Sequence, residues 1–235
     1  DGSTDNSAAI IKSFADKRIK LIDNKINSGL VSALNQGLNL AQGDYIARMD
    51  CDDISSADRL LKQINYLDRH QKIGVLGSWV KIIGDHNFVG KYYTKHEEIK
   101  ASLLFNSSLA HPSVVIRKKI LDRHNFRYDE KFKHAEDYKM WTRMINITDF
   151  ANLPEPLLFY RKHSASISKT QNEVQKINSQ EIRLEQIKKI GLEATDEELR
   201  IHGSILPSSP LLLEKFLPAA ENWLLKIIAA NEKSK

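Results

Sequence analysis

Apolar positions in the first seventy residues switch between two spacings. Leu30, Leu34 and Leu38 recur at helical spacing within residues 30–41, whereas residues 45–49 alternate at the spacing of a strand. The same patterns predict helices over residues 6–17 and 57–70 and a short strand over residues 19–22. Helices and strands in alternation are typical of an α/β fold, with a Rossmann-like, mainly parallel sheet flanked by helices.

The middle of the chain is richer in strands. Residues 73–83 are apolar and β-branched, Gly84 and Asp85 offer a turn, and residues 88–93 follow as the second arm of a hairpin. Helices are also predicted over residues 96–105 and 135–145, and strands over residues 113–116 and 157–160.

Beyond residue 168 the pattern is helical throughout. Residues 172–190 are amphipathic and polar, residues 196–202 continue as a helix, and residues 211–231 form a very apolar one. The sequence therefore predicts an α/β part over residues 1–168 and a helical C-terminal extension over residues 169–235. Packing or homodimerisation is the favoured role of the extension, and contact with a membrane surface is the less favoured one.

Composition narrows the class of protein. The chain has 235 residues, of which 41% are hydrophobic and 28% charged, so it is long enough to bury a substantial core. The net charge of +5 is spread along the chain, which argues against nucleic acid as a partner and suits anionic substrates. A single cysteine excludes an internal disulfide, and no apolar run is long enough to span a membrane. We expect a cytoplasmic protein.

Three carboxylates follow the strand at residues 45–49. Asp50, Asp52 and Asp53 stand where α/β folds place ligand sites, just beyond the carboxyl end of a strand. Clustered carboxylates repel one another unless a positive charge lies between them, and Mg²⁺ or Mn²⁺ prefers such oxygen ligands. A metal site is therefore favoured over an acidic turn that caps the next helix. Arg48 is expected to pair with the acids, and Arg59 to fold back on them.

A second acidic pair, Glu136 and Asp137, opens the helix predicted over residues 135–145. A carboxylate there can serve as a general base, but acids in a first helical turn also simply complement the helix dipole. The dipole is expected to keep Asp137 ionised. Arg161 and His163 follow the strand at residues 157–160, where their side chains can pair with phosphate oxygens or remain solvated.

Several of these blocks together resemble family 2 glycosyltransferases of the GT-A fold over residues 1–168. They begin with Asp-Gly-Ser-Thr-Asp at residues 1–5, Asn-Ser-Gly at 27–29 and Gly-Asp-Tyr-Ile at 43–46. Asp-Cys-Asp-Asp at 50–53, Asp-Arg-Leu at 58–60, His-Pro-Ser at 111–113, Glu-Asp at 136–137 and Tyr-Arg-Lys-His at 160–163 continue the order. Each block alone is weak evidence, but several in the right order are specific.

The resemblance implies an inverting, metal-dependent transferase that moves a hexosyl or N-acetylhexosaminyl group from a nucleoside diphosphate sugar, with UDP as the expected nucleotide. The acceptor is a hydroxyl of a glycan or a lipid-linked molecule, as in cell-surface polysaccharide or lipopolysaccharide assembly, at the inner face of the membrane. The implied metal ligands are Asp50, Asp52 and Asp53, and the implied catalytic pair is Asp137 with Glu136. Donor binding is implied for Asp1, Asn27, Gly29, Asp50, Arg161 and His163.

One part of the family pattern is missing. Relatives place a strand, a helix and a second strand before the Asp-Gly-Ser block, and this chain starts at that block. We therefore expect further residues upstream that complete the nucleotide site. Two alternatives stay open: a Mg²⁺-dependent phosphohydrolase of the haloacid dehalogenase type, which also places Asp-x-Asp at a strand end, and a non-catalytic nucleotide-binding module.

Overall fold

The computed structural model describes residues 1–84, 87–162, 172–205 and 210–233. The chain divides into two compact units, Asp1–Gln42 and Gly43–Lys235. Each unit is described by itself.

The first unit contains two helices, α1 (Ser7–Ser13) and α2 (Leu30–Leu40). Helix α2 matches the predicted segment and buries Val31 and Leu38. Helix α1 buries no side chain and is shorter than predicted, because a helix without a packed face gains little beyond its own backbone bonds. The strand predicted at residues 19–22 is wrong. These residues form no strand, since no neighbouring strand in this unit supplies backbone partners.

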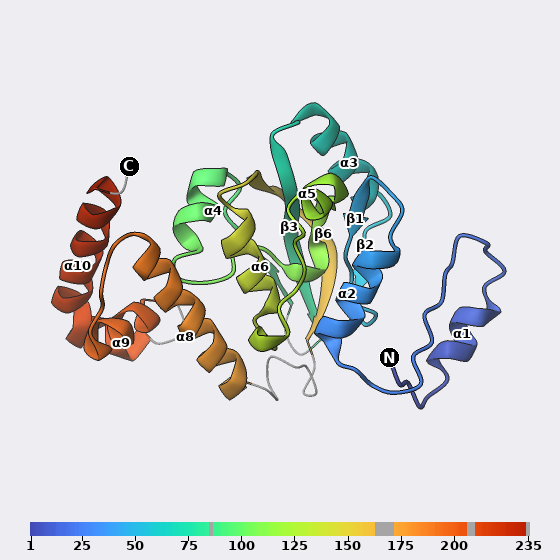
Figure 1. The fold of residues 1–235 in the computed structure, drawn as a ribbon, viewed down its shortest axis with the longest axis horizontal. Helices are drawn as coiled ribbons and strands as arrows, with labels where there is room; N and C mark the ends of the chain where they lie inside the picture. Colours follow the sequence, from blue (N-terminus) through green and yellow to red (C-terminus); the bar gives the residue numbers. More distant parts are fainter. Residues whose placement is uncertain (85–86, 163–171, 206–209, 234–235) are drawn as a thin grey trace. The chain divides into compact units, whose positions relative to one another are not determined.

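The second unit is organised around a curled six-stranded sheet (Figure 1). Its strands are β1 (Tyr45–Ala47), β2 (Ile54–Ser55), β3 (Ile73–Gly84), β4 (Phe88–Gly90), β5 (Val115–Arg117) and β6 (Asp149–Lys162). The order is β1-β5-β3-β6-β2, and β4 pairs with β3 as the predicted hairpin. The sheet is mixed, whereas the sequence predicts mainly parallel strands: β3 and β6 are parallel, but β1–β5, β3–β5, β3–β4 and β2–β6 are antiparallel.

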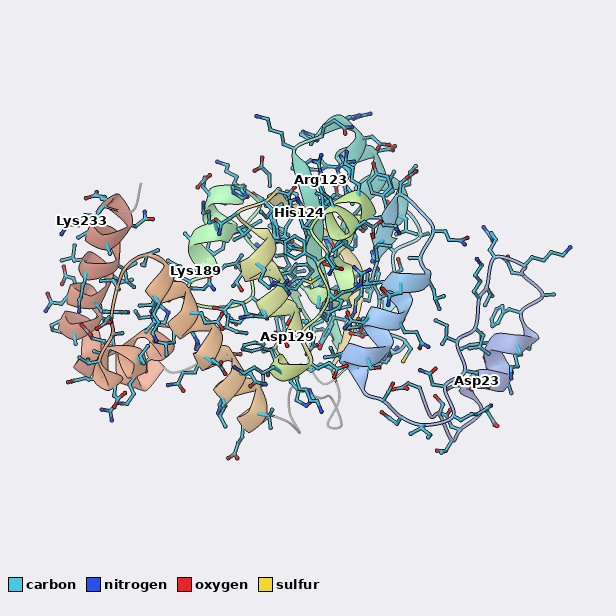
Figure 2. The ribbon with its side chains drawn as sticks, viewed as in Figure 1. Asp23, Arg123, His124, Asp129, Lys189 and Lys233 are labelled. Atoms are coloured by element: carbon cyan, nitrogen blue, oxygen red, sulfur yellow. The ribbon has the colours of Figure 1, made fainter. Side chains whose placement is uncertain are left out.

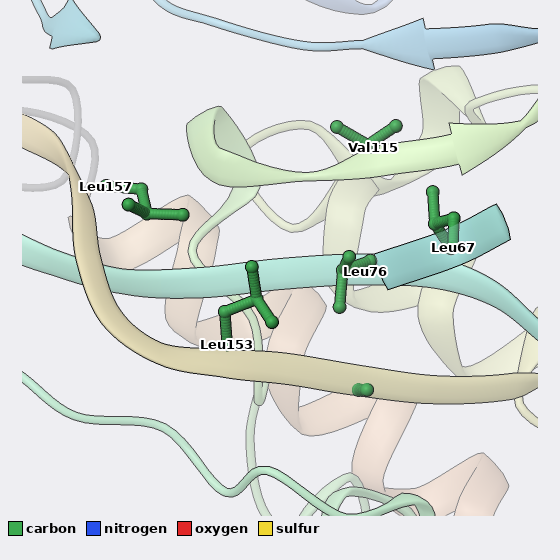
Figure 3. Close-up of a cluster of buried hydrophobic side chains, with 6 residues drawn as sticks. Leu67, Leu76, Val115, Leu153 and Leu157 are labelled. Carbon is green, nitrogen blue, oxygen red and sulfur yellow. The ribbon is translucent and has the colours of Figure 1, made fainter. Parts of the chain in front are cut away.

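Short helices connect and cover these strands. They are α3 (Arg59–Arg69), α4 (His96–Ser102), η1 (His111–Ser113), α5 (Lys118–Arg123), η2 (Glu130–Phe132) and α6 (Glu136–Met144). Helix α3 packs on β3 and β6, and the apolar cluster there brings together residues far apart in the chain (Figure 3). Its buried members are Leu67, Leu76, Val115, Ala151, Leu153 and Leu157. Burial of these side chains stabilises the sheet centre, from which the loops of the site extend.

The C-terminal residues form α8 (Asn172–Lys189), α9 (Asp196–Ser204) and α10 (Pro210–Lys233), as the sequence predicts for this region. They belong to the same compact unit as the sheet, since α8 packs on α6 and α9 packs on α10 (Figure 1). Ile187, Ile201, Trp223 and Ile227 form the apolar core between them. Exposed charged side chains such as Arg123 on α5 and Lys189 on α8 come from different helices (Figure 2).

No helix in the described ranges combines the length and the apolar character that crossing a membrane requires. The long apolar helix α10 turns Trp223 and Ile227 into the protein core, which accounts for part of its hydrophobicity.

Candidate active site

The acidic loop lies between β1 and β2, at the end of β1 where the sequence places it. The backbone N–H of Arg48 donates to the carbonyl of Val114 at 3.0 Å and so extends the pairing of β1 with the β5 side of the sheet. The Asp53 N–H then approaches the Asp50 carbonyl at 3.4 Å, and the chain turns between them. This turn presents three carboxylates within four residues at one edge of the sheet.

Arg48 holds Asp50 by two hydrogen-bonded contacts. Its Nη1 lies 2.7 Å from Oδ2 of Asp50 and its Nη2 lies 2.5 Å from Oδ1. Burial raises the pKa of Asp50, the Arg48 charge lowers it, and the charge of Asp52 raises it again. The expected pairing of Arg48 with the acids is therefore confirmed.

Arg59 holds the backbone at Arg48 by a hydrogen bond from its buried side chain. It is 1% exposed, and its Nη2 donates to the backbone carbonyl of Arg48 at 2.6 Å. Its Nε donates to Gln63, whose amide in turn donates to the carbonyl of Ser113 at 2.8 Å. Arg59 thus contacts the backbone of the acidic loop, and the charge of Asp53 offsets part of the effect of burial on the pKa of Arg59.

Asp53 points inward and joins the acidic loop to the end of β6. Its Oδ1 accepts a hydrogen bond from the backbone N–H of Arg161 at 2.8 Å, while its buried Oδ2 has no hydrogen-bond partner among the residues that the structure describes. Asp53 is 7% exposed, and burial raises its pKa to about 6. Burial and the neighbouring charges of Asp50 and Asp52 make the ionised form of Asp53 costly, so a cation bound at the loop would stabilise that form.

The segment at the end of β6 lies against the acidic loop, as the resemblance implies. Arg161 Nε donates to the backbone carbonyl of Asp52 at 2.8 Å. Burial raises the pKa of Tyr160, and the charges of Asp50, Asp53 and Asp52 raise it further. Tyr160 and Arg161 therefore face the acids. His163 lies outside the described residues.

The second acidic pair stands at the first turn of α6. Glu136 is 5% exposed, and burial, followed by repulsion from Asp137, raises its pKa to about 7. Its Oε2 is buried without a hydrogen-bond partner. Burial also raises the pKa of Asp137, against the opposing effects of the Tyr138 N–H, the Ser107 hydroxyl and Arg48. The amides at the helix N-terminus favour the ionised form of Asp137, as the sequence predicts, but burial has the larger effect and the pKa is raised overall.

Arg48 connects the two acidic groups. Besides its ion pair with Asp50, its charge lowers the pKa of Glu136 and of Asp137. The Arg48 charge thus acts on the acids of both groups, although 84 residues of sequence separate Asp53 from Asp137.

The acidic loop has the chemistry for a divalent cation but not a ready-made cage. Within the described ranges, no three or more His, Cys, Asp or Glu side chains are arranged as a set of metal ligands. The oxygens of Asp50, Asp52 and Asp53 are of the type that Mg²⁺ and Mn²⁺ prefer, and the unpartnered Asp53 Oδ2 reflects uncompensated negative charge. Cations of this type commonly use one or two protein carboxylates and complete their shell with water and phosphate oxygens, which suits this loop.

Asp1, Asn27 and Gly29 lie in the first unit and contact one another. The carboxylate of Asp1 accepts hydrogen bonds from the N–H groups of Ser28 and Gly29, the shortest of which is 2.9 Å, and from the Asn24 amide at 3.2 Å. Asn27 Oδ1 accepts from the Gly29 N–H at 3.0 Å. Gly29 has φ of 88°, which favours glycine. In the structure Asp1 organises the turn before α2.

Ser107 is a site residue that the sequence did not indicate. Its hydroxyl donates to Oδ2 of Asp137 at 3.2 Å, across 30 residues of chain. It belongs to no motif, and a serine in a polar loop carries no signal of such a contact. His111, by contrast, is a structural residue: it is buried, its Nε2 lies 2.8 Å from the Tyr128 hydroxyl, and burial holds its pKa well below the usual value.

Sequence relatives carry the names of glycosyltransferases. The chain is 32% identical over 210 residues to an uncharacterised glycosyltransferase of Haemophilus influenzae, covering 82% of this chain and 65% of the relative. It is 32% identical over 145 residues to UDP-Glc:alpha-D-GlcNAc-diphosphoundecaprenol beta-1,3-glucosyltransferase WfgD of Escherichia coli, covering 62% of this chain and 55% of the relative. The chain thus spans between half and two thirds of the length of these relatives.

Solved structures share the fold. Residues 1–349 of Staphylococcus aureus TarS in complex with UDP-GlcNAc match with a TM-score of 0.64 and 16% identity, covering 97% of this chain and 70% of that one. The Pyrobaculum calidifontis mannosyltransferase PcManGT in complex with GDP-Man and Mn²⁺ matches with a TM-score of 0.52 and 16% identity, covering 97% of this chain and 64% of that one. The GT-A type of α/β fold is therefore confirmed.

The family model described as glycosyl transferase family 2 matches residues 1–146, more than half of the chain. This range includes both the acidic loop and the Glu136–Asp137 pair. The chain belongs to glycosyl transferase family 2.

Proposed function

We propose that this protein transfers a hexosyl or N-acetylhexosaminyl group, with inversion, from a nucleoside diphosphate sugar to an acceptor hydroxyl. The observation that carries the proposal is the loop of three acids beyond the end of β1, where Arg48 pairs with Asp50, within the same family match as the acidic pair Glu136 and Asp137. We assign the donor-binding acids and the candidate base to one site, and the effect of the Arg48 charge on both groups supports this assignment. Support comes also from the relative in Escherichia coli, which is named for transfer from UDP-Glc.

The acidic loop serves the donor diphosphate. Asp52 is exposed at the tip of the loop, and we assign it as the main carboxylate ligand of a Mg²⁺ or Mn²⁺ ion, with Asp50 contacting the ion through water or contacting the ribose. Asp53 contributes negative charge and holds the end of β6. When bound, the ion supplies positive charge where the departing diphosphate gains negative charge. The Mn²⁺ in the mannosyltransferase complex supports this assignment.

Asp137 takes the proton of the acceptor. As the acceptor oxygen bonds to the anomeric carbon, the bond from that carbon to the diphosphate oxygen breaks and its electron pair leaves with the nucleotide. The hydroxyl proton passes to Asp137, which must be ionised beforehand. The Ser107 hydroxyl, the Tyr138 N–H and Arg48 favour the ionised form, while burial raises its proton affinity.

Glu136 contributes to the same site in its protonated form. With a pKa of about 7, it is largely neutral below neutral pH, while the Ser107 hydroxyl and the Tyr138 N–H favour the ionised form of Asp137. Two carboxylates whose environments differ in this way are suited to separate roles. Glu136 therefore keeps a second negative charge away from Asp137.

Arg161 is assigned to the diphosphate. Its Nε donates to the backbone carbonyl of Asp52, and its backbone N–H donates to Asp53. Its guanidinium is thus held against the acidic loop, where it adds positive charge beside the proposed phosphate position. His163 is proposed to follow it in the same role. In the first unit, Asp1, Asn27 and Gly29 are proposed to contact the nucleotide. The expected nucleotide is UDP, and TarS, named in complex with UDP-GlcNAc, supports that choice.

The acceptor is proposed to be a glycan or lipid-linked sugar in cell-surface polysaccharide or lipopolysaccharide assembly. The diphosphoundecaprenol-linked acceptor in the name of the Escherichia coli relative supports this class. A cytoplasmic location with association at the inner membrane face, and a homodimer through the C-terminal helices, are further proposals. The phosphohydrolase and the non-catalytic module gain no support from the comparisons, which match transferases.

The test is a screen of nucleotide sugars for thermal stabilisation of the full chain, with and without Mn²⁺. A ligand that binds the native state stabilises it by RT ln(1 + L/Kd), where L is the free ligand concentration, and so raises the melting temperature as L exceeds Kd. We expect one nucleotide sugar to stabilise the protein only with the metal, followed by release of its nucleoside diphosphate on turnover. Release of inorganic phosphate from phosphomonoesters without sugar transfer would overturn the proposal.

A further inference from the structure

A cavity of about 910 Å³ opens beside the candidate base. Tyr92 and Tyr93 line it from the segment after β4, and Phe105 and Ser107 from the segment after α4. Ile205 and Leu224 line it from the C-terminal helices. Its size is that of a small-molecule site, and its walls come from three stretches of the second unit.

Ser107 joins this cavity to the chemistry. The same residue lines the cavity and donates its hydroxyl to Oδ2 of Asp137 at 3.2 Å. Tyr92 lines the same cavity, and burial, with smaller effects of Tyr160 and Asp137, raises its pKa to about 12. A molecule in the cavity therefore contacts Ser107, and through its hydroxyl it is one hydrogen bond away from the carboxylate proposed to accept the proton.

The lining suits a sugar. Tyr92, Tyr93 and Phe105 offer aromatic surface, and Asn106 and Ser107 add small polar groups. A pyranose ring has an apolar face of C–H groups and an edge of hydroxyls, so it uses both kinds of surface at once. Lys91 and Glu98 add charged groups to the lining, and a simple hydrocarbon chain would offer such groups no hydrogen bonds.

We propose that this cavity binds the acceptor saccharide and that the C-terminal helices, through Ile205 and Leu224, help to select it. The proposal rests on the proposed glycosyl transfer. It assigns a role to residues beyond the matched family region, since α9 and α10 follow residue 146.

A buried histidine, His202, connects the C-terminal helices to the segment after α4 that lines the cavity. His202 of α9 lies with Nε2 2.8 Å from the Leu104 carbonyl, and its Nδ1 accepts from Trp223 Nε1 at 3.0 Å. Its ring also stacks on Phe105, with centroids 4.5 Å apart. Because Phe105 itself lines the cavity, the contact sets the helices directly against the proposed sugar surface.

The first test uses two neighbouring leucines of α10. Leu224 lines the cavity, whereas Leu225 is 57% exposed and does not line it. We expect Leu224→Trp to fill part of the cavity and raise the KM for the acceptor about tenfold or more, with the KM for the donor and its slow hydrolysis by water unchanged. Leu225→Trp is the matched control and should behave as the wild type.

A second variant guards against misfolding of the first. Tyr93 is 58% exposed, so Tyr93→Ala should fold normally and also weaken acceptor use without affecting donor hydrolysis. The acceptor probes are octyl and p-nitrophenyl glycosides of hexoses and N-acetylhexosamines. Binding is followed by saturation-transfer NMR, transfer by product mass, and folding of each variant by its thermal transition.

The outcomes separate this inference from the proposed function. If the wild type hydrolyses a donor but binds no glycoside, or binds octanol as well as octyl glycosides, the cavity is not a saccharide site. Equal acceptor KM in the folded variants and the wild type would also overturn it. If the wild type neither binds nor turns over any donor, the proposed glycosyl transfer itself fails, and the acceptor assignment fails with it.

Discussion

The Arg48 guanidinium faces the Asp50 carboxylate with both terminal nitrogens, at 2.7 and 2.5 Å. This paired geometry fixes the first acid of the loop, while the third acid, Asp53, is held by the backbone N–H of Arg161. Because the same guanidinium lowers the pKa of Glu136 and Asp137, it connects the donor side of the site to the candidate base.

Removal of the Arg48 charge should therefore move the acid limb of the pH–rate profile. In Arg48→Met, the carboxylates of Asp50 and Asp137 lose a positive charge that stabilises their ionised forms, so their pKa values rise. A higher pH is then needed to ionise the base. We expect the acid limb of kcat/KM to shift upward, with Arg48→Lys in between. The exposed Arg123 on α5 provides the control, Arg123→Met (Figure 2). An unshifted acid limb in Arg48→Met would refute the link.

The role of Asp52 can be measured without turnover. Asp52→Ala should weaken Mn²⁺-dependent binding of UDP by about tenfold or more, equivalent to about 1.4 kcal/mol, because a charged metal ligand is lost. Isothermal titration calorimetry of UDP with and without Mn²⁺ gives both values. Asp44→Ala removes an exposed carboxylate just before β1 and should bind as the wild type does. Metal-dependent binding that survives in Asp52→Ala would move the ligand assignment elsewhere.

Asp137→Asn separates binding from chemistry. The amide keeps the size of the side chain but cannot take a proton, so we expect donor affinity to stay within error and kcat for transfer to fall about 10²–10⁴-fold. Ser107→Ala, which removes a donor to Oδ2, should have a smaller effect. Asp122→Asn, on an exposed side chain of α5, is the control. Transfer at the wild-type rate in Asp137→Asn would show that another group is the base.

The sequence predicts the parts of this site better than their arrangement. Asp50, Asp52 and Asp53 are found at a strand end because apolar alternation followed by clustered acids is a local pattern, and the Arg48–Asp50 pair spans only two residues. The prediction of a strand at residues 19–22 was wrong because a strand is not determined by a local pattern alone. A strand depends on backbone partners from elsewhere in the chain, and a four-residue apolar run does not show whether they exist.

The contacts that join the parts are all long-range. The antiparallel pairing of β2 with β6 sets Ile54 opposite Phe159, and it brings Arg161 beside Asp53. Ser107 reaches Asp137 only because the segments around them are packed together in the fold. No periodicity or spacing encodes such contacts, so neither the mixed strand directions nor the cavity at Ser107 could be predicted from the pattern of residues.

Glu136 should make folding stability depend on pH. Its pKa is raised from the ordinary 4.5 to about 7, so the folded state favours the neutral form. Its contribution is fully present below about pH 4.5 and is lost as the pH rises through 7. Relative to Glu136→Gln, the wild type should lose about 3 kcal/mol of unfolding free energy across this window. Urea unfolding at several pH values measures the difference, and a difference independent of pH would contradict it.

His202 should make folding stability depend on pH with the opposite sign to Glu136. Burial lowers the pKa of His202 below the ordinary 6.5. The bond from Trp223 to Nδ1 also requires a neutral ring, because a protonated Nδ1 cannot accept it. The positive charge of Arg183 also opposes protonation, whereas the bond to the Leu104 carbonyl favours it. The contribution of His202 is therefore present above about pH 6.5 and is lost as the pH falls, by up to about 1.4 kcal/mol per pH unit.

The measurement is urea unfolding of the wild type and of His202→Phe between pH 5 and pH 8. The variant should be less stable at pH 8, where it lacks both hydrogen bonds, and the gap should narrow as the pH falls because only the wild type then binds an extra proton on unfolding. The exposed His124 at the end of α5 gives the control, His124→Phe (Figure 2). A gap that stays constant across this range would mean that His202 is not held neutral between Trp223 and Leu104.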